Sequence, residues 1–117
     1  MIDIQKQSVV NESIALIVRE YLMNLRQQDI PVSYGVVFGS QVHGGAGPWS
    51  DIDLLVVSPR FDECRKRSDI NLLWRVAART DSRIEPIPVG QQQFLTDDSS
   101  AIIEIARREG QLIPLAE

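Results

Sequence analysis

The sequence predicts a small α+β protein, in an α/β-like arrangement with helices packed on a β-sheet. Two observations support this. Apolar residues recur every three or four positions in several stretches, which is typical of amphipathic helices. Short apolar runs bounded by glycine or proline lie between those stretches and indicate strands. Because helices and strands alternate, we expect one sheet covered by the helices.

The chain has 117 residues, of which 44% are hydrophobic and 24% charged. This length predicts a single domain over residues 1–117, and the composition is that of a globular protein. The formal net charge of −4 gives no general attraction to nucleic acid or anionic lipid, so we expect neither direct nucleic-acid binding nor a membrane partner.

The cysteine and hydropathy patterns indicate a cellular location. Cys64 is the lone cysteine, which excludes an intrachain disulfide framework. No apolar stretch approaches the length of a membrane span, and the first residues lack the apolar region of a signal peptide. A cytoplasmic location is therefore expected.

The first helix is expected to begin near Asn11, with Ser8 or Asn11 as its N-cap. It should end at residues 29–31, because proline disfavours helical geometry in the preceding residue. Its buried face should carry the apolar residues spaced by three and four, namely Ile14, Ile17, Val18, Tyr21, Leu22 and Leu25.

Three runs indicate strands. Residues 34–38 form the first, and a glycine-rich loop over 41–50 follows it. Residues 51–57 form the second, whose unbroken apolar end predicts burial on both faces. In the third, 83–89, two prolines remove N–H groups on one side, so it should lie at a sheet edge or pair incompletely.

The remaining elements are helical or short. A second helix is expected within residues 62–79 and a short turn of helix over 91–96. A last helix should open at Ser99 or Ser100 and end at Gly110, before an extended piece over 112–115. The apolar stripe expected on the second helix consists of Ile70, Leu73, Trp74 and Ala77.

Asp51 and Asp53 open the second strand and are the first candidates for chemistry. Side chains two apart in a strand point to the same face, about 7 Å apart along the backbone. Two carboxylates held that close repel each other unless a cation lies between them. Mg²⁺ is bound by one or two carboxylates together with substrate phosphates, so this pair is a candidate magnesium site.

Two further features complete a possible reaction centre. Gly39 allows close backbone approach, and a short helix starting at Ser40 would present free N–H groups and a hydroxyl to an anion. Glu85 lies in a strand-like run, where a carboxylate is unusual without a partner. It is a candidate third metal ligand or general base for an acceptor hydroxyl, in a centre where two metals clamp the attacking and leaving oxygens.

The motif Gly39-Ser40, ten intervening residues and Asp51-x-Asp53, followed by a carboxylate in a later strand, resembles the nucleotidyltransferase superfamily that includes DNA polymerase beta. The compact length resembles its minimal nucleotidyltransferase branch. The resemblance implies a small mixed sheet with helices against it. It also implies that Asp51, Asp53 and Glu85 hold Mg²⁺, two ions in all, and that Gly39 and Ser40 hold the nucleotide phosphates.

By this resemblance, the chain moves a nucleoside monophosphate, AMP from ATP, onto an acceptor hydroxyl. Stand-alone members of the branch commonly pair with a HEPN-domain protein in toxin–antitoxin modules. The resemblance thus implies an antitoxin that modifies or covers such a partner. A chain this short has no room for a separate acceptor-binding domain, so a partner protein or a second subunit in a homo-oligomer should supply the acceptor pocket.

Other interpretations remain open. Gln41 and His43 stand where many relatives carry arginines and supply less positive charge for a triphosphate. The second hypothesis is therefore a weak or inactive module of this fold that acts by protein binding. A small-molecule nucleotidyltransferase of the antibiotic-modifying kind is the third hypothesis. For each candidate carboxylate, the alternative to a role in the site is an ordinary solvated surface residue.

Overall fold

The computed structural model describes residues 10–115, and a four-stranded sheet forms its centre. The strand order is β3-β2-β1-β4. β1 pairs antiparallel with β2 and with β4, whereas β2 and β3 are parallel, so the sheet is mixed. This architecture confirms the predicted class. The strands are β1 (Tyr34–Phe38), β2 (Ile52–Ser58), β3 (Ile84–Gly90) and β4 (Gln111–Pro114).

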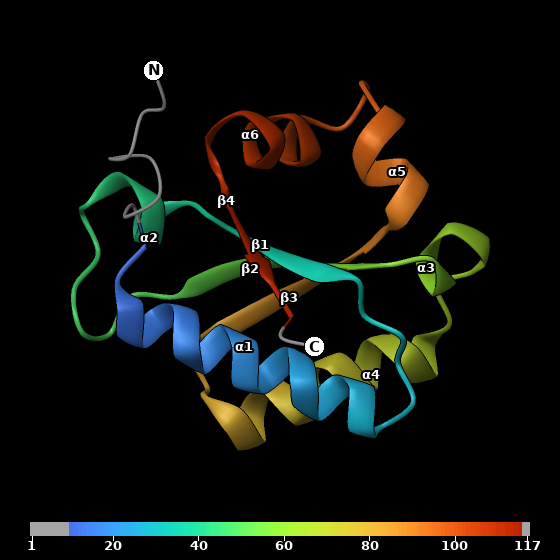
Figure 1. The fold of residues 1–117 in the computed structure, drawn as a ribbon, viewed down its shortest axis with the longest axis horizontal. Coiled ribbons are helices and arrows are strands. Elements are labelled where there is room, and N and C mark those ends of the chain that lie inside the picture. Colours follow the sequence, from blue (N-terminus) through green and yellow to red (C-terminus); the bar gives the residue numbers. More distant parts are fainter. Residues whose placement is uncertain (1–9, 116–117) are drawn as a thin grey trace.

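Helices cover both faces of the sheet (Figure 1). α1 (Glu12–Gln27) and α4 (Arg67–Thr80) pack on one face, and α5 (Gln91–Thr96) and α6 (Ala101–Glu109) lie over the other. The core consists of two hydrophobic clusters, one on each face of the sheet. Alternate residues of β2 belong to one or the other, which confirms that β2 is buried on both faces. Ile52, Leu54 and Val56 belong to the α1/α4 cluster, and Leu55 and Val57 to the α5/α6 cluster.

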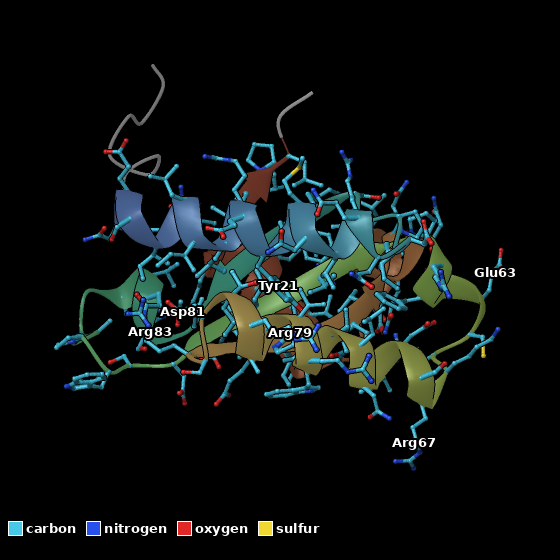
Figure 2. The ribbon with its side chains drawn as sticks, turned by 90° about the horizontal axis from the view of Figure 1, so that it is seen from below. Tyr21, Glu63, Arg67, Arg79, Asp81 and Arg83 are labelled. Atoms are coloured by element: carbon cyan, nitrogen blue, oxygen red, sulfur yellow. The ribbon has the colours of Figure 1, made fainter. Side chains whose placement is uncertain are left out.

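α1 begins as predicted, because the Asn11 side chain accepts a hydrogen bond of 2.7 Å from the Ser13 N–H. The alternative cap Ser8 lies outside the described residues. Tyr21 is fully buried between α1 and α4 (Figure 2) and donates from its hydroxyl to the Leu73 carbonyl at 3.0 Å. Burial raises the pKa of Tyr21. The other buried residues of α1 are Ile14, Val18, Leu22 and Leu25, as predicted, whereas Ile17 is half-buried.

The second helical region differs from the prediction. It forms two helices, α3 (Arg60–Glu63) and α4, because the backbone is extended at Cys64 and Lys66. Trp74 was expected in the apolar stripe, but it is 48% exposed. The reason is the rotational setting of α4: Asp69 turns inward and accepts two hydrogen bonds from Arg60, at 3.0 and 3.1 Å. The buried stripe is therefore Asp69, Leu73, Val76 and Ala77.

β3 is an edge strand, as its two prolines predicted, and pairs only with β2 among the described strands. It runs one residue later than expected, from Ile84 to Gly90. α5 and α6 also form where expected, and Ser100 caps α6 by accepting from the Ile103 N–H at 3.3 Å. β4 then returns beside β1.

Gly90 joins β3 to α5 and allows Asp62 of α3 to cap that helix. Asp62 accepts from the backbone N–H groups of Gln92 and Gln93 at 2.9 and 3.1 Å. A Cβ on residue 90 would lie 1.9 Å from Asp62 Oδ1 and 2.9 Å from Asp62 Cα. The capping interaction therefore needs glycine at this position.

We expect Gly90→Ala to lower the free energy of unfolding by about 1–3 kcal/mol, the usual range for an overpacked site. Urea denaturation of the single and double variants measures it. In the Asp62→Ala background, Gly90→Ala should lower the free energy of unfolding by less, because the clashing carboxylate is absent. Equal costs of Gly90→Ala in the two backgrounds would contradict this account.

In the part of the chain that the structure describes, every helix is too short or too polar to span a lipid bilayer.

Candidate active site

The candidate site lies at the end of the sheet where β1 ends and β2 and β3 begin. Asp53 is paired in register with Glu85 on one side and with Phe38 on the other. By strand alternation, Asp53 faces the same side as Leu55 and Val57, and Glu85 the same side as Ile87. Both carboxylates thus project from the face that α5 and α6 cover.

Asp51 joins this pair from outside the sheet. β2 begins at Ile52, so Asp51 lies one residue before the strand in which it was expected. Its side chain is exposed, and it lies near enough to Asp53 and Glu85 to raise the pKa of both carboxyl groups. The structure therefore brings all three candidate carboxylates together.

The electrostatics of the cluster are unfavourable without a cation. Burial, and then the negative charge of Asp51, raise the pKa of Asp53. Burial, the hydrogen bond to Asp51 and the charges of both aspartates raise the pKa of Glu85. The carboxyl groups of Asp53 and Glu85 are thus harder to ionise beside Asp51, and a bound cation would replace this repulsion by attraction.

Gly39 places the end of β1 directly against Asp53. Its φ of 78° and ψ of −146° belong to a region that is essentially restricted to glycine. A Cβ there would lie 2.4 Å from Asp53 Oδ2. Ser40 follows as the first residue of α2 (Ser40–His43) and is exposed. The predicted phosphate-binding turn and the carboxylates are therefore neighbours.

α2 corrects the predicted loop. Residues 41–43 are helical, and the loop starts at Gly44, whose left-handed φ of 76° ends the helix. Gln41 is buried, and its side-chain N–H₂ donates to the Asp51 and Ser50 carbonyls at 3.1 and 3.4 Å. His43 is exposed, with Nε2 3.1 Å from Glu109 Oε1. Both side chains thus have protein partners.

Within residues 10–115, no group of three or more His, Cys, Asp or Glu side chains is arranged so that it could hold a metal ion. The donor set itself suits Mg²⁺, which binds hard carboxylate oxygens together with water and substrate phosphates. Residues 51, 53 and 85 therefore fit this ion in their chemistry.

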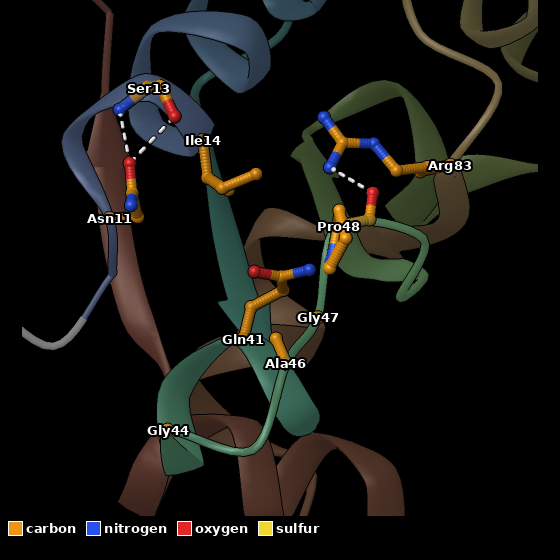
Figure 3. Close-up of a pocket in the computed structure, with 9 residues that line it drawn as sticks. All are labelled: Asn11, Ser13, Ile14, Gln41, Gly44, Ala46, Gly47, Pro48 and Arg83. Atoms are coloured by element: carbon orange, nitrogen blue, oxygen red, sulfur yellow. Dashed lines mark hydrogen bonds between the residues drawn. The ribbon is translucent and has the colours of Figure 1, made fainter.

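A cavity of about 390 Å³ adjoins α2 (Figure 3). Gln41 lines it, as does Arg83, which donates to the Pro48 carbonyl at 3.3 Å and to the Asp81 carboxylate at 2.9 and 3.1 Å. That carboxylate is the main cause of the raised pKa of Arg83. Gln41 and Arg83 anchor the loop before Asp51, a role that sequence reasoning missed because their partners are backbone carbonyls.

Other polar and aromatic residues stand apart from these contacts. Trp49 is 88% exposed. Arg75 and Arg79 are exposed on α4. Cys64 is a free, exposed thiol.

Comparisons with known proteins bear on the family and on the fold. A family model described as "Nucleotidyltransferase domain" matches residues 18–108. No curated protein is similar enough in sequence to count as a match. Among solved structures, a protein from Sulfolobus solfataricus, proposed to be a nucleotidyltransferase, has a TM-score of 0.57 at 16% identity over 93% of this chain and 83% of its own.

A second solved structure is a toxin–antitoxin complex with AMP-PNP. The matched chain has a TM-score of 0.56 at 18% identity, over 85% of this chain and 74% of its own. At these identities the two structures show a shared fold. The family model covers most of the chain, including the Gly39-Ser40 turn and all three carboxylates. The chain therefore belongs to the nucleotidyltransferase domain family.

Proposed function

We propose that the chain is a Mg²⁺-dependent nucleotidyltransferase that moves a nucleoside monophosphate, AMP from ATP, onto an acceptor hydroxyl and releases pyrophosphate. The observation that supports this proposal most directly is that Asp51, Asp53 and Glu85 lie near one another and beside Gly39. In-line displacement at a phosphorus needs the charge on the transferred group to be neutralised, and a carboxylate cluster beside an open turn suits that need.

Each residue has a distinct role in this proposal. Asp51, Asp53 and Glu85 hold Mg²⁺, and two ions are proposed because two metals stabilise both the attacking and the leaving oxygens. Gly39 lets the backbone approach the phosphates, and the Ser40 hydroxyl donates to them. In this proposal Glu85, at the edge strand, also accepts the proton of the acceptor hydroxyl.

We further propose that the acceptor belongs to a partner protein, with this chain as the antitoxin of a HEPN-containing toxin–antitoxin pair. One observation supports this: a solved structure of the same fold is a toxin–antitoxin complex with AMP-PNP.

The test is transfer of label from ATP carrying radioactive phosphorus at the α-position. The chain is incubated with Mg²⁺ and this ATP, with and without the protein encoded by its neighbouring gene. We expect the neighbour to become labelled, and no labelling when the radioactive phosphorus is at the γ-position. Asp51→Asn with Asp53→Asn should reduce labelling at least 10³-fold, on the order of the loss of metal assistance.

Persistent labelling by the double variant, with its fold intact by circular dichroism, would contradict the metal-binding role. A stable complex with no label under any nucleotide would favour the second candidate, a binding module that has lost catalysis. One observation favours that candidate: Gln41 and His43, which by the family resemblance stand where many relatives carry arginines, bond to Asp51 and Glu109.

A further inference from the structure

Gln41 is a buried polar residue with a contact that reaches the candidate site. Its side chain is within the molecule, with only 7% of the residue exposed. A buried amide costs free energy unless it is hydrogen-bonded, and here its N–H₂ group satisfies that need by donating to the Asp51 and Ser50 carbonyls. The position of this side chain is therefore fixed from both sides, by α2 and by the chain before β2.

Asp51 depends on such contacts because it lies outside the sheet. The ladder between β2 and β3 begins at Ile52, so strand pairing does not hold Asp51 itself. On its C-terminal side, Ile52 donates its N–H to the Arg83 carbonyl at 2.8 Å. On its N-terminal side, the Ser50 N–H donates to the Gly47 carbonyl at 3.1 Å. Gln41 supplies the bond to the Asp51 carbonyl itself.

The same side chain also connects two parts of the site. Gln41 directly follows Ser40 in α2, and the neighbouring Gly39 contacts Asp53. The N–H₂ group of Gln41 is bonded to the loop, whereas its side-chain oxygen faces the cavity on the side of α1 (Figure 3). A shift of α2 would therefore move the Asp51 backbone with it.

We propose that Gln41 is a positioning residue, which fixes the Asp51 carboxylate relative to the Ser40 turn by holding the Asp51 carbonyl. This inference rests on the proposed function, because it assigns Gln41 a role in metal binding by Asp51. Residues that orient metal ligands through hydrogen bonds typically change metal affinity or activity by about 10–100-fold when they are replaced. Gln41 acts through the backbone of Asp51 and touches no reacting atom.

Three variants separate positioning from packing. Gln41→Met has a similar length but no donor, and Gln41→Glu presents an ionised carboxylate to the two carbonyls. Gln41→His keeps a ring N–H at a similar reach. The matched control is Gly45→Ala in the adjoining loop, where an added Cβ meets no atom within 4 Å. Melting temperature and circular dichroism establish the fold of each.

The main readout is Mn²⁺ affinity, measured from the electron paramagnetic resonance signal of the free ion. We expect Gln41→Met and Gln41→Glu to bind Mn²⁺ about 10–100-fold more weakly, Gln41→His to recover most of the affinity, and Gly45→Ala to match the wild type. Exchange of the Ser50 amide hydrogen should be faster in the two variants that lack the donor, because the loop is no longer tied to α2.

The outcomes are distinguishable. Wild-type Mn²⁺ affinity in a folded Gln41→Met or Gln41→Glu protein would overturn the inference and leave the proposed function standing. An absence of Mn²⁺ binding by the wild type would overturn the proposed function and the inference with it. If both donor-lacking variants unfold while Gln41→His folds but still binds Mn²⁺ weakly, the role of Gln41 is structural and the inference is wrong.

Discussion

Gly39→Ala is expected to abolish nucleotidyl transfer and to destabilise the fold. The backbone at Gly39 has a φ of 78° and a ψ of −146°, and holding an alanine there costs about 1–3 kcal/mol. In addition, the new Cβ would lie 2.4 Å from Asp53 Oδ2, so Asp53 must move away from the turn. Transfer activity and urea denaturation of the same preparation measure the two effects.

Gly44→Ala is the matched control, because it separates backbone strain from displacement of Asp53. Gly44 also has a positive φ, 76°, but a Cβ there meets no atom within 4 Å. We expect this variant to lose about 1 kcal/mol of stability and to keep its activity. If Gly39→Ala and Gly44→Ala lose stability equally and both remain active, the contact between Gly39 and Asp53 has no role in function.

Asp53→Asn is expected to stabilise the metal-free protein while eliminating activity. Burial and the charge of Asp51 disfavour the ionised form of Asp53, and the amide removes that charge. Because about 1 kcal/mol corresponds to 4–8 °C in a domain near this size, we expect a rise of roughly 2–6 °C in the melting temperature in EDTA at pH 7. Such an exchange of stability for activity is common where charges are clustered for catalysis.

The pH dependence of this gain has a definite sign. The pKa of Asp53 is higher in the folded than in the unfolded protein, so folding favours its protonated form. The stability that protonation gives is fully present below the unfolded pKa, about 3.9, and is lost as pH rises through the folded value. The melting temperatures of wild type and Asp53→Asn should therefore be closest below about pH 4 and separate above it.

Bound metal should reverse the order of the melting temperatures of the wild type and Asp53→Asn. Excess Mg²⁺ or Mn²⁺ is expected to raise the melting temperature of the wild type, because a ligand that binds only the folded state stabilises it, and to leave Asp53→Asn nearly unchanged. A wild type that is more stable than Asp53→Asn in EDTA at pH 7 would contradict the proposed repulsion among the carboxylates.

The elements with strong local patterns could be predicted from the sequence. The spacing of apolar residues in α1, the unbroken apolar run in β2 and the two prolines of β3 each reflect one physical constraint acting on neighbouring residues. The placement of β3 at the sheet edge followed from its prolines, since a strand that lacks donors cannot pair fully on both sides. The motif of Gly39, Ser40 and the two aspartates was similarly local.

Features that depend on distant partners could not be predicted. Trp74 has the same spacing as its buried neighbours, and only the inward pairing of Asp69 with Arg60 shows that the helix is rotated away from it. The in-register pairing of Asp53 with Glu85 depends on the crossover through α3 and α4, which no local pattern encodes. Gln41 bonds to backbone carbonyls, and these leave no trace in residue identity.

The most direct test of the central claim is a crystal structure of the protein with Mn²⁺ and a non-hydrolysable ATP analogue, with the metal located by its anomalous scattering. We expect Mn²⁺ at about 2.0–2.2 Å from carboxylate oxygens of Asp51, Asp53 and Glu85, with the analogue's phosphates at Gly39 and Ser40. Metal and phosphates bound away from these residues, with the three carboxylates unchanged, would contradict the account.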